Sequence, residues 1–159
     1  ADTLARFHIG ALPKDFGSTG FSALDANGQA VSCAVTLNAP FGSAHTAQGT
    51  GVLLAPAPHG NAGLAGAFLA PMIAADGNDV KLAVAGVGGP NGVAAIGHAV
   101  LKAAGGGALG VPADLRSTGQ APFDTVNVIA CQSVCVALSD PGAHGLGAAA
   151  PAPIPAPDK

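Results

Sequence analysis

Hydroxyl and amide side chains stand at both ends of one short stretch of this chain, residues 18–38. Ser18 and Thr19 begin the stretch, and Thr36 and Asn38 lie near its end. Side chains of these types can donate and accept hydrogen bonds at a binding or catalytic site. They can meet at one site only if the chain turns back between them. We therefore expect a candidate site beside Ser18 and Thr19, with Thr36 and Asn38 next to it.

A second candidate is the glycine pair Gly88–Gly89, which precedes a predicted helix. Free backbone N–H groups before a helix can point at an oxyanion that develops during a reaction. The order of strand, glycine loop and helix resembles a phosphate-binding loop only loosely, because the Walker lysine and the full dinucleotide fingerprint are absent. The simpler interpretation, which the spacing alone favours, is that a turn requires these glycines.

The stretch that would position the first group is predicted to be a β-hairpin over residues 20–38. Its turn is Asp25-Ala26-Asn27-Gly28, since Asn-Gly tolerates the positive φ of tight hairpin turns. After the turn, apolar residues alternate with small or polar ones. The apolar row is Val31, Cys33, Val35 and Leu37, and the other row is Ser32, Ala34, Thr36 and Asn38. This period of two places the two rows on opposite faces of the strand.

The rest of the chain is predicted to contain further strands and one helix. The expected strands, which include a short buried one at the start and a bent or divided one at the end, cover residues 49–54, 67–75, 80–85, 124–130 and 134–138. Pro71 interrupts or borders the second of these. The helix is expected from about residue 92 to residue 104, where three glycines end it. These elements indicate an α+β protein with mostly antiparallel sheet and few helices.

The composition describes a chain of low charge. The 159 residues suit one domain, and 49% are hydrophobic while only 9% are charged, against about 25% in an average protein. Such a surface suits burial against another protein, although a bias toward Ala, Gly and Pro explains it equally well. The net charge of −3 gives no basic surface for nucleic acid. No apolar run is long enough to span a membrane. Because the chain begins with Ala1, we expect an exported protein, periplasmic or secreted.

The three cysteines allow at most one internal disulfide. Cys131 and Cys135 do not have the spacing of a zinc site, and no second Cys/His pair accompanies them. Their sulfur atoms could meet if residues 131–135 form a tight turn, but one straight strand would hold them too far apart. We favour the interpretation that Cys33, Cys131 and Cys135 are small apolar residues, and we expect no metal and no cofactor. A thiol or metal module remains a weaker alternative.

Three motifs together resemble the small subunit of the γ-glutamyltranspeptidases, which are N-terminal-nucleophile hydrolases. They are Ser18-Thr19-Gly20-Phe21-Ser22, the turn Asp25-Ala26-Asn27-Gly28, and Thr36-Leu37-Asn38. The similarity runs from about Ser18 to Val100 and continues faintly over 126–142. It implies a partial αββα sandwich whose two sheets take strands from two subunits, and therefore a hetero-oligomer with another protein. It also divides the chain into an N-terminal extension (1–17), a small-subunit-like domain (18–147) and a Pro/Ala-rich tail (148–159).

The resemblance also implies roles for the candidate residues. Ser18 occupies the position of the nucleophile, which in the family is a threonine whose own α-amine acts as the base after autocleavage. Here that cleavage would have to fall between Gly17 and Ser18. Thr19 matches the second residue of the nucleophile motif, and Thr36 matches the residue that supports the nucleophile. In the same way Asn38 matches a residue that holds the glutamyl group, and Gly88–Gly89 match the oxyanion glycines.

Other family features are missing from this sequence. The acidic residue that binds the substrate amine is replaced by Ala57-Pro58-His59-Gly60, and a Ser-Ser pair by Ala67-Phe68. The family's carboxylate-binding arginine belongs to the large subunit. We therefore favour a non-catalytic accessory or structural subunit of a larger, periplasmic protein complex. The alternative is a serine-dependent γ-glutamyl hydrolase or transferase that cleavage between Gly17 and Ser18 activates.

Overall fold

The computed structural model describes residues 17–57, 68–107, 109, 125–140 and 145–149. Within these residues lie six strands and one helix. They are β1 (Ser18–Leu24), β2 (Ala30–Thr36), β3 (Met72–Asp76), β4 (Asp79–Val87), α3 (Pro90–Ala104), β5 (Thr125–Cys131) and β6 (Cys135–Ser139). The expected hairpin, the four strands expected after residue 66 and the helix are therefore confirmed, with ends that differ by a few residues from those predicted.

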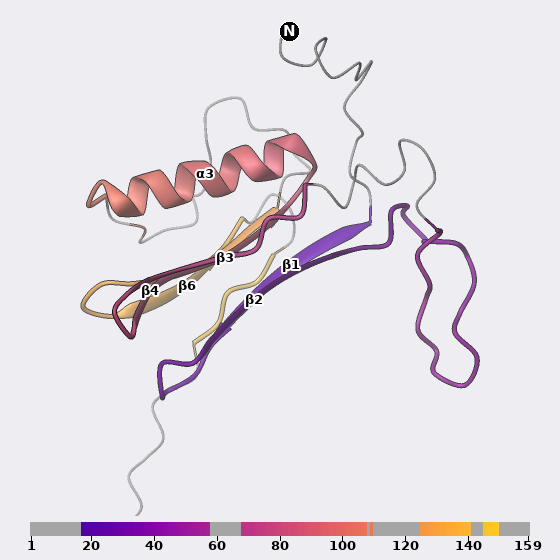
Figure 1. Ribbon diagram of the computed structural model, residues 1–159, viewed down its shortest axis with the longest axis horizontal. Helices are drawn as coiled ribbons and strands as arrows, with labels where there is room; N and C mark the ends of the chain where they lie inside the picture. Colours follow the sequence, from indigo (N-terminus) through magenta and orange to yellow (C-terminus); the bar gives the residue numbers. More distant parts are fainter. Residues whose placement is uncertain (1–16, 58–67, 108, 110–124, 141–144, 150–159) are drawn as a thin grey trace, which may run out of the picture.

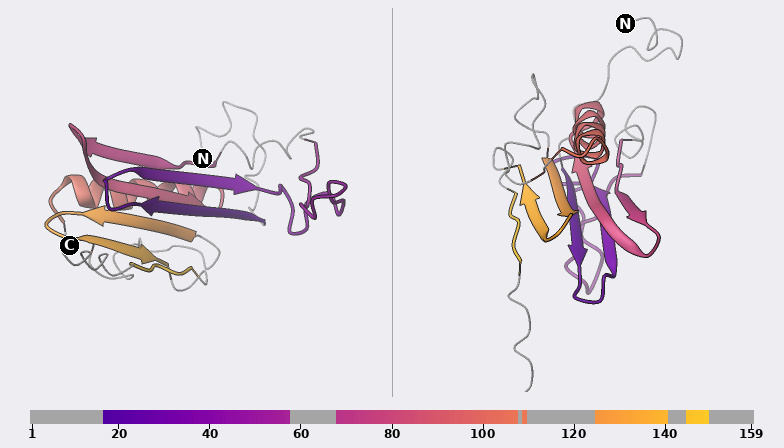
Figure 2. Two further views of the ribbon diagram at one scale, coloured as in Figure 1. Left: turned by 90° about the horizontal axis from the view of Figure 1, so that it is seen from below. Right: turned by 90° about the vertical axis from the view of Figure 1, so that its left-hand side faces the viewer.

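These elements form three layers (Figure 1). The central layer is an antiparallel four-stranded sheet in the order β3-β4-β5-β6. Helix α3 covers one face of this sheet, and the antiparallel β1–β2 hairpin lies across the other face, as the end-on view in Figure 2 shows. The prediction of an α+β fold with a partial αββα sandwich is confirmed, and the described residues supply the α, β and β layers.

The buried apolar core lies between α3 and the four-stranded sheet. Its members are Leu82, Val84, Ala95, Ile96, Ala99, Leu109, Val126, Val128, Ala130 and Leu138. Two glycines let the helix approach closely. A Cβ atom on Gly86 would lie 2.6 Å from Cγ1 of Ile96, and a Cβ atom on Gly92 would lie 2.6 Å from the carbonyl carbon of Val87. The even-numbered residues of β4 therefore face α3, and its odd-numbered residues face the hairpin.

The hairpin packs on the sheet through small and polar side chains. A Cβ atom on Gly20 would lie 3.0 Å from Cβ of Ala85. The hydroxyl of Ser32 donates a 2.7 Å hydrogen bond to the carbonyl of Val84 and accepts one from Ser22 at 3.2 Å. The small or polar row of the predicted hairpin thus faces the interior of the sandwich.

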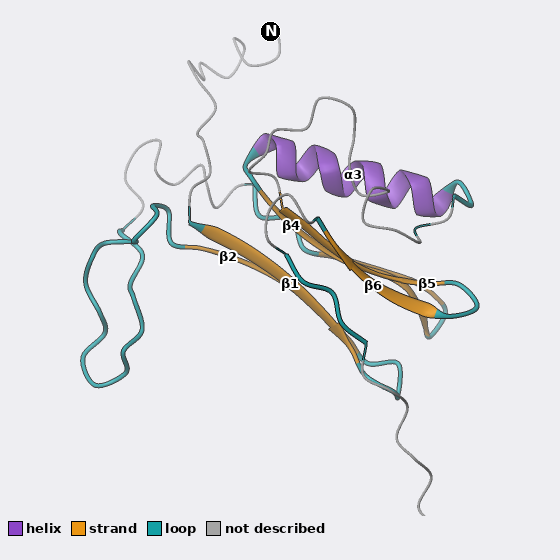
Figure 3. Cartoon of the chain, turned by 180° about the vertical axis from the view of Figure 1, so that it is seen from behind, coloured by secondary structure: helices purple, strands orange, loops and turns teal. Residues whose placement is uncertain are grey.

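The apolar row of the hairpin faces outward. Phe21, Val31 and Val35 are 50%, 49% and 47% exposed, and Cys33 is half-buried between them. Among the described residues, no helix or strand covers this side of the hairpin (Figure 3). The hydrophobic alternation that predicted the strand therefore marks its uncovered face rather than its core face.

A long loop over residues 39–57 extends away from the sandwich beyond the start of β1 (Figure 1). The expected buried strand over 49–54 is wrong. Val52 and Leu54 are exposed, and the regular pairing here is one isolated bridge between Thr46 and Leu53. Backbone hydrogen bonds within the loop hold its two sides together, for example from the Ser43 amide to the carbonyl of Leu54 at 2.8 Å. The apolar residues of this segment therefore do not pack against a sheet or helix of the described chain.

The interpretation of Cys131 and Cys135 as separate apolar residues is also wrong. They form a disulfide across the turn that joins β5 to β6. The tight turn that this pairing needs is present, because two strands rather than one straight strand cover this region. Cys33 is a free cysteine. None of the helices among the described residues has the length and apolarity to cross a membrane.

The proposed boundaries at residues 17 and 148 stay predictions, because residues 1–16 and 150–159 lie outside the described part of the chain.

Two glycines of α3 make a matched test of the packing between helix and sheet. Gly92→Ala should lower the free energy of unfolding by about 1–3 kcal/mol, because its methyl group meets the Val87 backbone. Gly97→Ala should raise it by about 0.5–1 kcal/mol, because that position is open and alanine favours the helix. Denaturant unfolding of both variants measures the difference, and equal effects of the two substitutions would contradict this packing.

Candidate functional site

The hairpin brings Ser18 and Thr36 together. Ser18 is the first residue of β1 and pairs directly with Thr36, the last residue of β2. Residues that pair in this way project their side chains from the same face. Both belong to the inward-facing row, and both are partly buried. The pairing register of β1 and β2 therefore places Ser18 and Thr36 next to each other, as the sequence predicted.

The residue before Ser18 must be a glycine. Gly17 has φ of +105°, and a Cβ atom there would run into the carbonyl of Ala39. The carbonyl of Gly17 accepts a 2.8 Å hydrogen bond from the amide of Leu37. The Gly17–Ser18 peptide thus continues the ladder of the hairpin by one position. This ladder fixes the backbone on both sides of the bond that the family's chemistry would cleave.

Asn38 lies two residues after Thr36, just beyond the end of β2. It has φ of +56°, a conformation that asparagine tolerates better than most residues. Its amide donates a 2.9 Å hydrogen bond to the hydroxyl oxygen of Thr36. Its side-chain oxygen Oδ1 is buried and accepts no hydrogen bond from the described residues. Asn38 Oδ1 is therefore an unpaired acceptor in the interior of the described residues, not one that is open to solvent.

Gly88 and Gly89 form the junction between β4 and α3. Their φ values are +124° and +65°, and Gly89 is the N-cap of the helix without a side-chain cap. Both conformations favour glycine, so the turn itself requires the pair. The contact between Gly20 and Ala85 aligns the start of β1 with the end of β4. Ser18 and the two glycines consequently lie at the same end of the sandwich (Figure 1).

Thr19 is separated from the other candidates. It follows Ser18 in an extended strand, so its side chain projects from the opposite face. Thr19 is exposed and pairs with Val35 on the outer face of the hairpin. The structure thus gathers Ser18, Thr36 and Asn38 at one end, with the glycine pair nearby, and places Thr19 on the other side.

No described cation lies at this end of the sandwich. The lysines that the structure describes are Lys81, near the start of β4, and Lys102, in the last turn of α3. Strand and helix rises place each about 20 Å from the Gly88–Gly89 junction. The stretch that replaces the family's acidic residue lies outside the described residues, apart from the exposed Ala57. Among the described residues, this end therefore has no cation. It does have one buried carboxylate, Asp140, which follows β6 and whose amide donates to the carbonyl of Val126.

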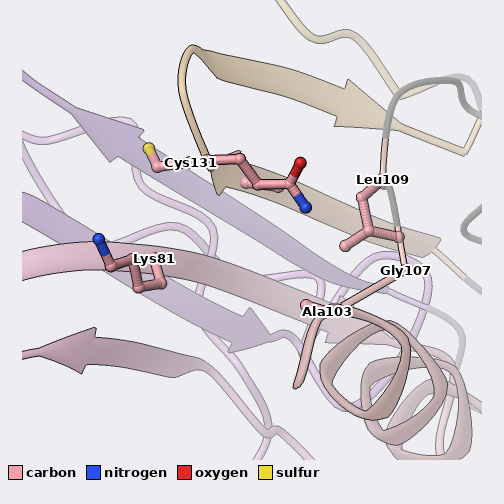
Figure 4. Close-up of a pocket in the computed structure, with 7 residues that line it drawn as sticks. Lys81, Ala103, Gly107, Leu109 and Cys131 are labelled. Carbon is pink, nitrogen blue, oxygen red and sulfur yellow. The ribbon is translucent and has the colours of Figure 1, made fainter. Parts of the chain in front are cut away.

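Two cavities lie away from the candidate residues. One, of about 310 Å³, lies between the Ser22–Leu24 segment of β1, the β5–β6 face and residues 146–148. The other, of about 260 Å³, is bordered by Lys81, Leu109 and Cys131 (Figure 4). Within the described ranges, no group of three His, Cys or acidic residues is placed to hold a metal ion.

Asn127 is a contact that sequence reasoning missed. Its side-chain Nδ2 donates a 2.6 Å hydrogen bond to the carbonyl of Gly20, from β5 to β1. This carbonyl points away from β2, so Asn127 occupies the free edge of β1 and ties it to the central sheet. The sequence contained one indication of this contact: Asn127 is a polar amide between two valines of a predicted strand.

The hydrogen bond between Thr36 and Asn38 can be tested by stability. Thr36→Val preserves the shape but removes the acceptor for the Asn38 amide, so the free energy of unfolding should fall by about 0.5–1.5 kcal/mol. Thr19→Val, on the exposed face of the same hairpin, should change it by less than about 0.5 kcal/mol. Chemical denaturation measures both, and a Thr36→Val variant as stable as Thr19→Val would contradict the assignment.

Comparisons with known proteins agree with the resemblance. Residues 4–58 match the family model of Gamma-glutamyltranspeptidase. A comparison with curated proteins gives no match. Among solved structures, the chain is similar to Gamma-glutamyltranspeptidase from Pseudomonas nitroreducens complexed with L-DON, with 21% identity and a TM-score of 0.59. The similarity covers 84% of this chain and 100% of that one.

A highly active mutant of the same Pseudomonas nitroreducens enzyme gives the same identity and TM-score, with 84% of this chain and 99% of that chain covered. At this level of identity, the likeness concerns the fold. The expected resemblance is thus confirmed at two levels: residues 4–58 have the sequence pattern of the γ-glutamyltranspeptidases, and the chain has the fold of their solved structures.

Proposed function

We propose that this chain is a non-catalytic accessory subunit, derived from a γ-glutamyltranspeptidase small subunit, that works within a larger periplasmic protein complex. The observation that carries the proposal is the outward apolar face of the β1–β2 hairpin. Phe21, Val31 and Val35 lie side by side there and are each about half exposed. An exposed cluster of this kind is typical of a surface that another protein covers.

The hairpin also needs a neighbour for structural reasons. Within the described residues its sheet has only two strands, and a two-stranded sheet is marginally stable in water without further packing. One face packs on the central sheet, but the other face has no layer of its own. Outward apolar residues and unpaired edges suit a partner that contributes apolar side chains or further strands.

The proposal that catalysis is lost has two supports. While Ser18 remains bonded to Gly17, its nitrogen is an amide and cannot act as the base that the family's chemistry requires. No described cation lies near Ser18 to bind the carboxylate of a glutamyl substrate. A charge-assisted hydrogen bond of that kind contributes about 1.5–3 kcal/mol. Without such a bond, Thr36 and Asn38 alone would bind a zwitterionic substrate weakly.

The alternative, a serine-dependent γ-glutamyl hydrolase or transferase, has one observation in its favour. The family match begins before Ser18 and continues to residue 58, so it includes both sides of the Gly17–Ser18 bond. Cleavage there would free the α-amine of Ser18 beside the Thr36 hydroxyl. Charged groups for the substrate would then have to come from a second subunit.

A periplasmic or secreted location is part of the same proposal. The Cys131–Cys135 disulfide supports it, because disulfides form and persist in oxidising compartments.

Two matched substitutions test the partner surface. Val35→Asp places a charge on the outer face of the hairpin, whereas Val134→Asp places one at the exposed turn between β5 and β6. We expect the wild-type chain and Val134→Asp to co-purify with a protein partner at native abundance, and Val35→Asp to lose it by at least about tenfold. A chain that is monomeric in the native extract, or a Val35→Asp variant that keeps the partner, would contradict the proposal.

Intact mass and a γ-glutamyl hydrolysis assay on the same sample distinguish the two functions. The accessory-subunit proposal expects the bond between Gly17 and Ser18 to stay whole and γ-glutamyl hydrolysis to equal that of Ser18→Ala. A new N-terminus at Ser18, with hydrolysis that Ser18→Ala abolishes, would establish the enzymatic alternative instead.

A further inference from the structure

The Cys131–Cys135 disulfide crosses the β5–β6 hairpin at its turn. The two cysteines are the last directly paired residues of the two strands, and their Cα atoms are 4.0 Å apart. Gln132, Ser133 and Val134 form the turn between them, and all three are exposed. The bond therefore lies at an open end of the molecule, away from the end that holds Ser18.

The hairpin does not depend on this bond. Four further residue pairs, from Asn127–Ser139 to Ala130–Val136, continue the ladder below it. Val128 and Leu138 anchor the two strands in the core. A disulfide stabilises chiefly by restricting a loop of the unfolded chain, and a loop this short leaves little entropy to remove. The bond can therefore open and close while the fold persists.

The two sulfur atoms differ in their surroundings. Cys135 is exposed, whereas Cys131 is half-buried and borders the cavity of about 260 Å³ that Lys81 also borders. Because Cys135 is the more exposed of the two residues, we take its sulfur as the one that an incoming group attacks. Exposed disulfides are the ones that exchange readily with thiols.

Lys81 lies beside Cys131. Leu82 pairs with Ala130 in the β4–β5 ladder, so the next residues, Lys81 and Cys131, stand opposite each other. In Figure 4 the Lys81 amine and the Cys131 sulfur extend toward the same side of these strands. Lys81 is half-exposed and also lies 3.7 Å from the carboxylate of Asp79, which is largely exposed. An ammonium group close to this cysteine would stabilise a thiolate on Cys131.

We propose that Cys131–Cys135 is a thiol–disulfide exchange site whose substrate is a dithiol. One thiolate of the dithiol attacks Sγ of Cys135, the Cys131–Cys135 bond breaks, and Cys131 leaves as a thiolate beside Lys81. The second thiolate of the dithiol then attacks the dithiol sulfur that is bonded to Cys135. This closes a disulfide within the dithiol and releases Cys135 as a thiolate. The dithiol is oxidised to a disulfide, the cysteine pair is reduced by two electrons, and the two protons released by the dithiol are available to the two new thiolates.

The first experiment measures reduction of the folded chain. The Cys33→Ser variant of the full chain, in which all thiol labels come from the pair, is treated with dithiothreitol, then with a maleimide, and weighed intact. We expect two labels to appear at a rate within about tenfold of the rate in denaturant, because the exposed sulfur needs no unfolding. Far-UV circular dichroism should stay unchanged. A rate about a thousandfold or more below that in denaturant, or loss of the fold on reduction, would overturn the proposal.

The second experiment tests the order of attack in the same Cys33→Ser background. A monothiol, glutathione, should form its mixed disulfide on Cys135, which peptide mass spectrometry locates. Lys81→Gln should slow reduction by about three- to tenfold, since the leaving thiolate loses its cation, and Lys81→Arg should restore the rate. Glutathione on Cys131, or equal rates for Lys81→Gln and Lys81→Arg, would overturn the assignment of Cys131 as the leaving group.

Discussion

The close approach of the hairpin to the central sheet governs the rest of this structure. Gly20 lies tightly against Ala85, where an added Cβ atom would be only 3.0 Å from the Cβ of Ala85, and the neighbouring contact joins the Ser32 hydroxyl to the Val84 carbonyl. A larger side chain at Gly20 would separate these two strands, although a cavity lined in part by Ile129 lies further along β1. The row of the hairpin that contains Gly20 and Ser32 must therefore face inward, and Asn127 ties the free edge of β1 to the same sheet.

The same constraint leaves the apolar row of the hairpin on the outside. Successive side chains of a strand alternate between its two faces, so Phe21, Val31 and Val35 have no access to the core that α3 and the sheet enclose. The molecule has one core between helix and sheet, one thin polar contact between the sheets, and one apolar face with no described layer. In the proposed function, a partner protein covers this apolar face.

The two ends of the sandwich have different chemistry. At one end, the register places Ser18 beside Thr36, and the β4–α3 junction requires the glycines Gly88 and Gly89. These features are polar, and the described residues add a buried carboxylate, Asp140, but no cation at this end. At the other end, Lys81 and the Cys131–Cys135 pair follow from the register of β4, β5 and β6. Chemistry at that end depends on sulfur and on one ammonium group.

Local patterns in the sequence determined the elements and their connection. The Asn27-Gly28 turn fixed the hairpin, because few residues tolerate its backbone angles, and the spacing of that hairpin brought Ser18 and Thr36 together. Tertiary structure decided which face of the hairpin is covered, since a period of two does not say which row meets another layer. It also decided the disulfide, because the meeting of Cys131 and Cys135 depends on where one strand ends and the next begins. Tertiary structure also decided that the segment 49–54 is exposed, because no other element packs against it among the described residues. A local sequence pattern does not contain that information.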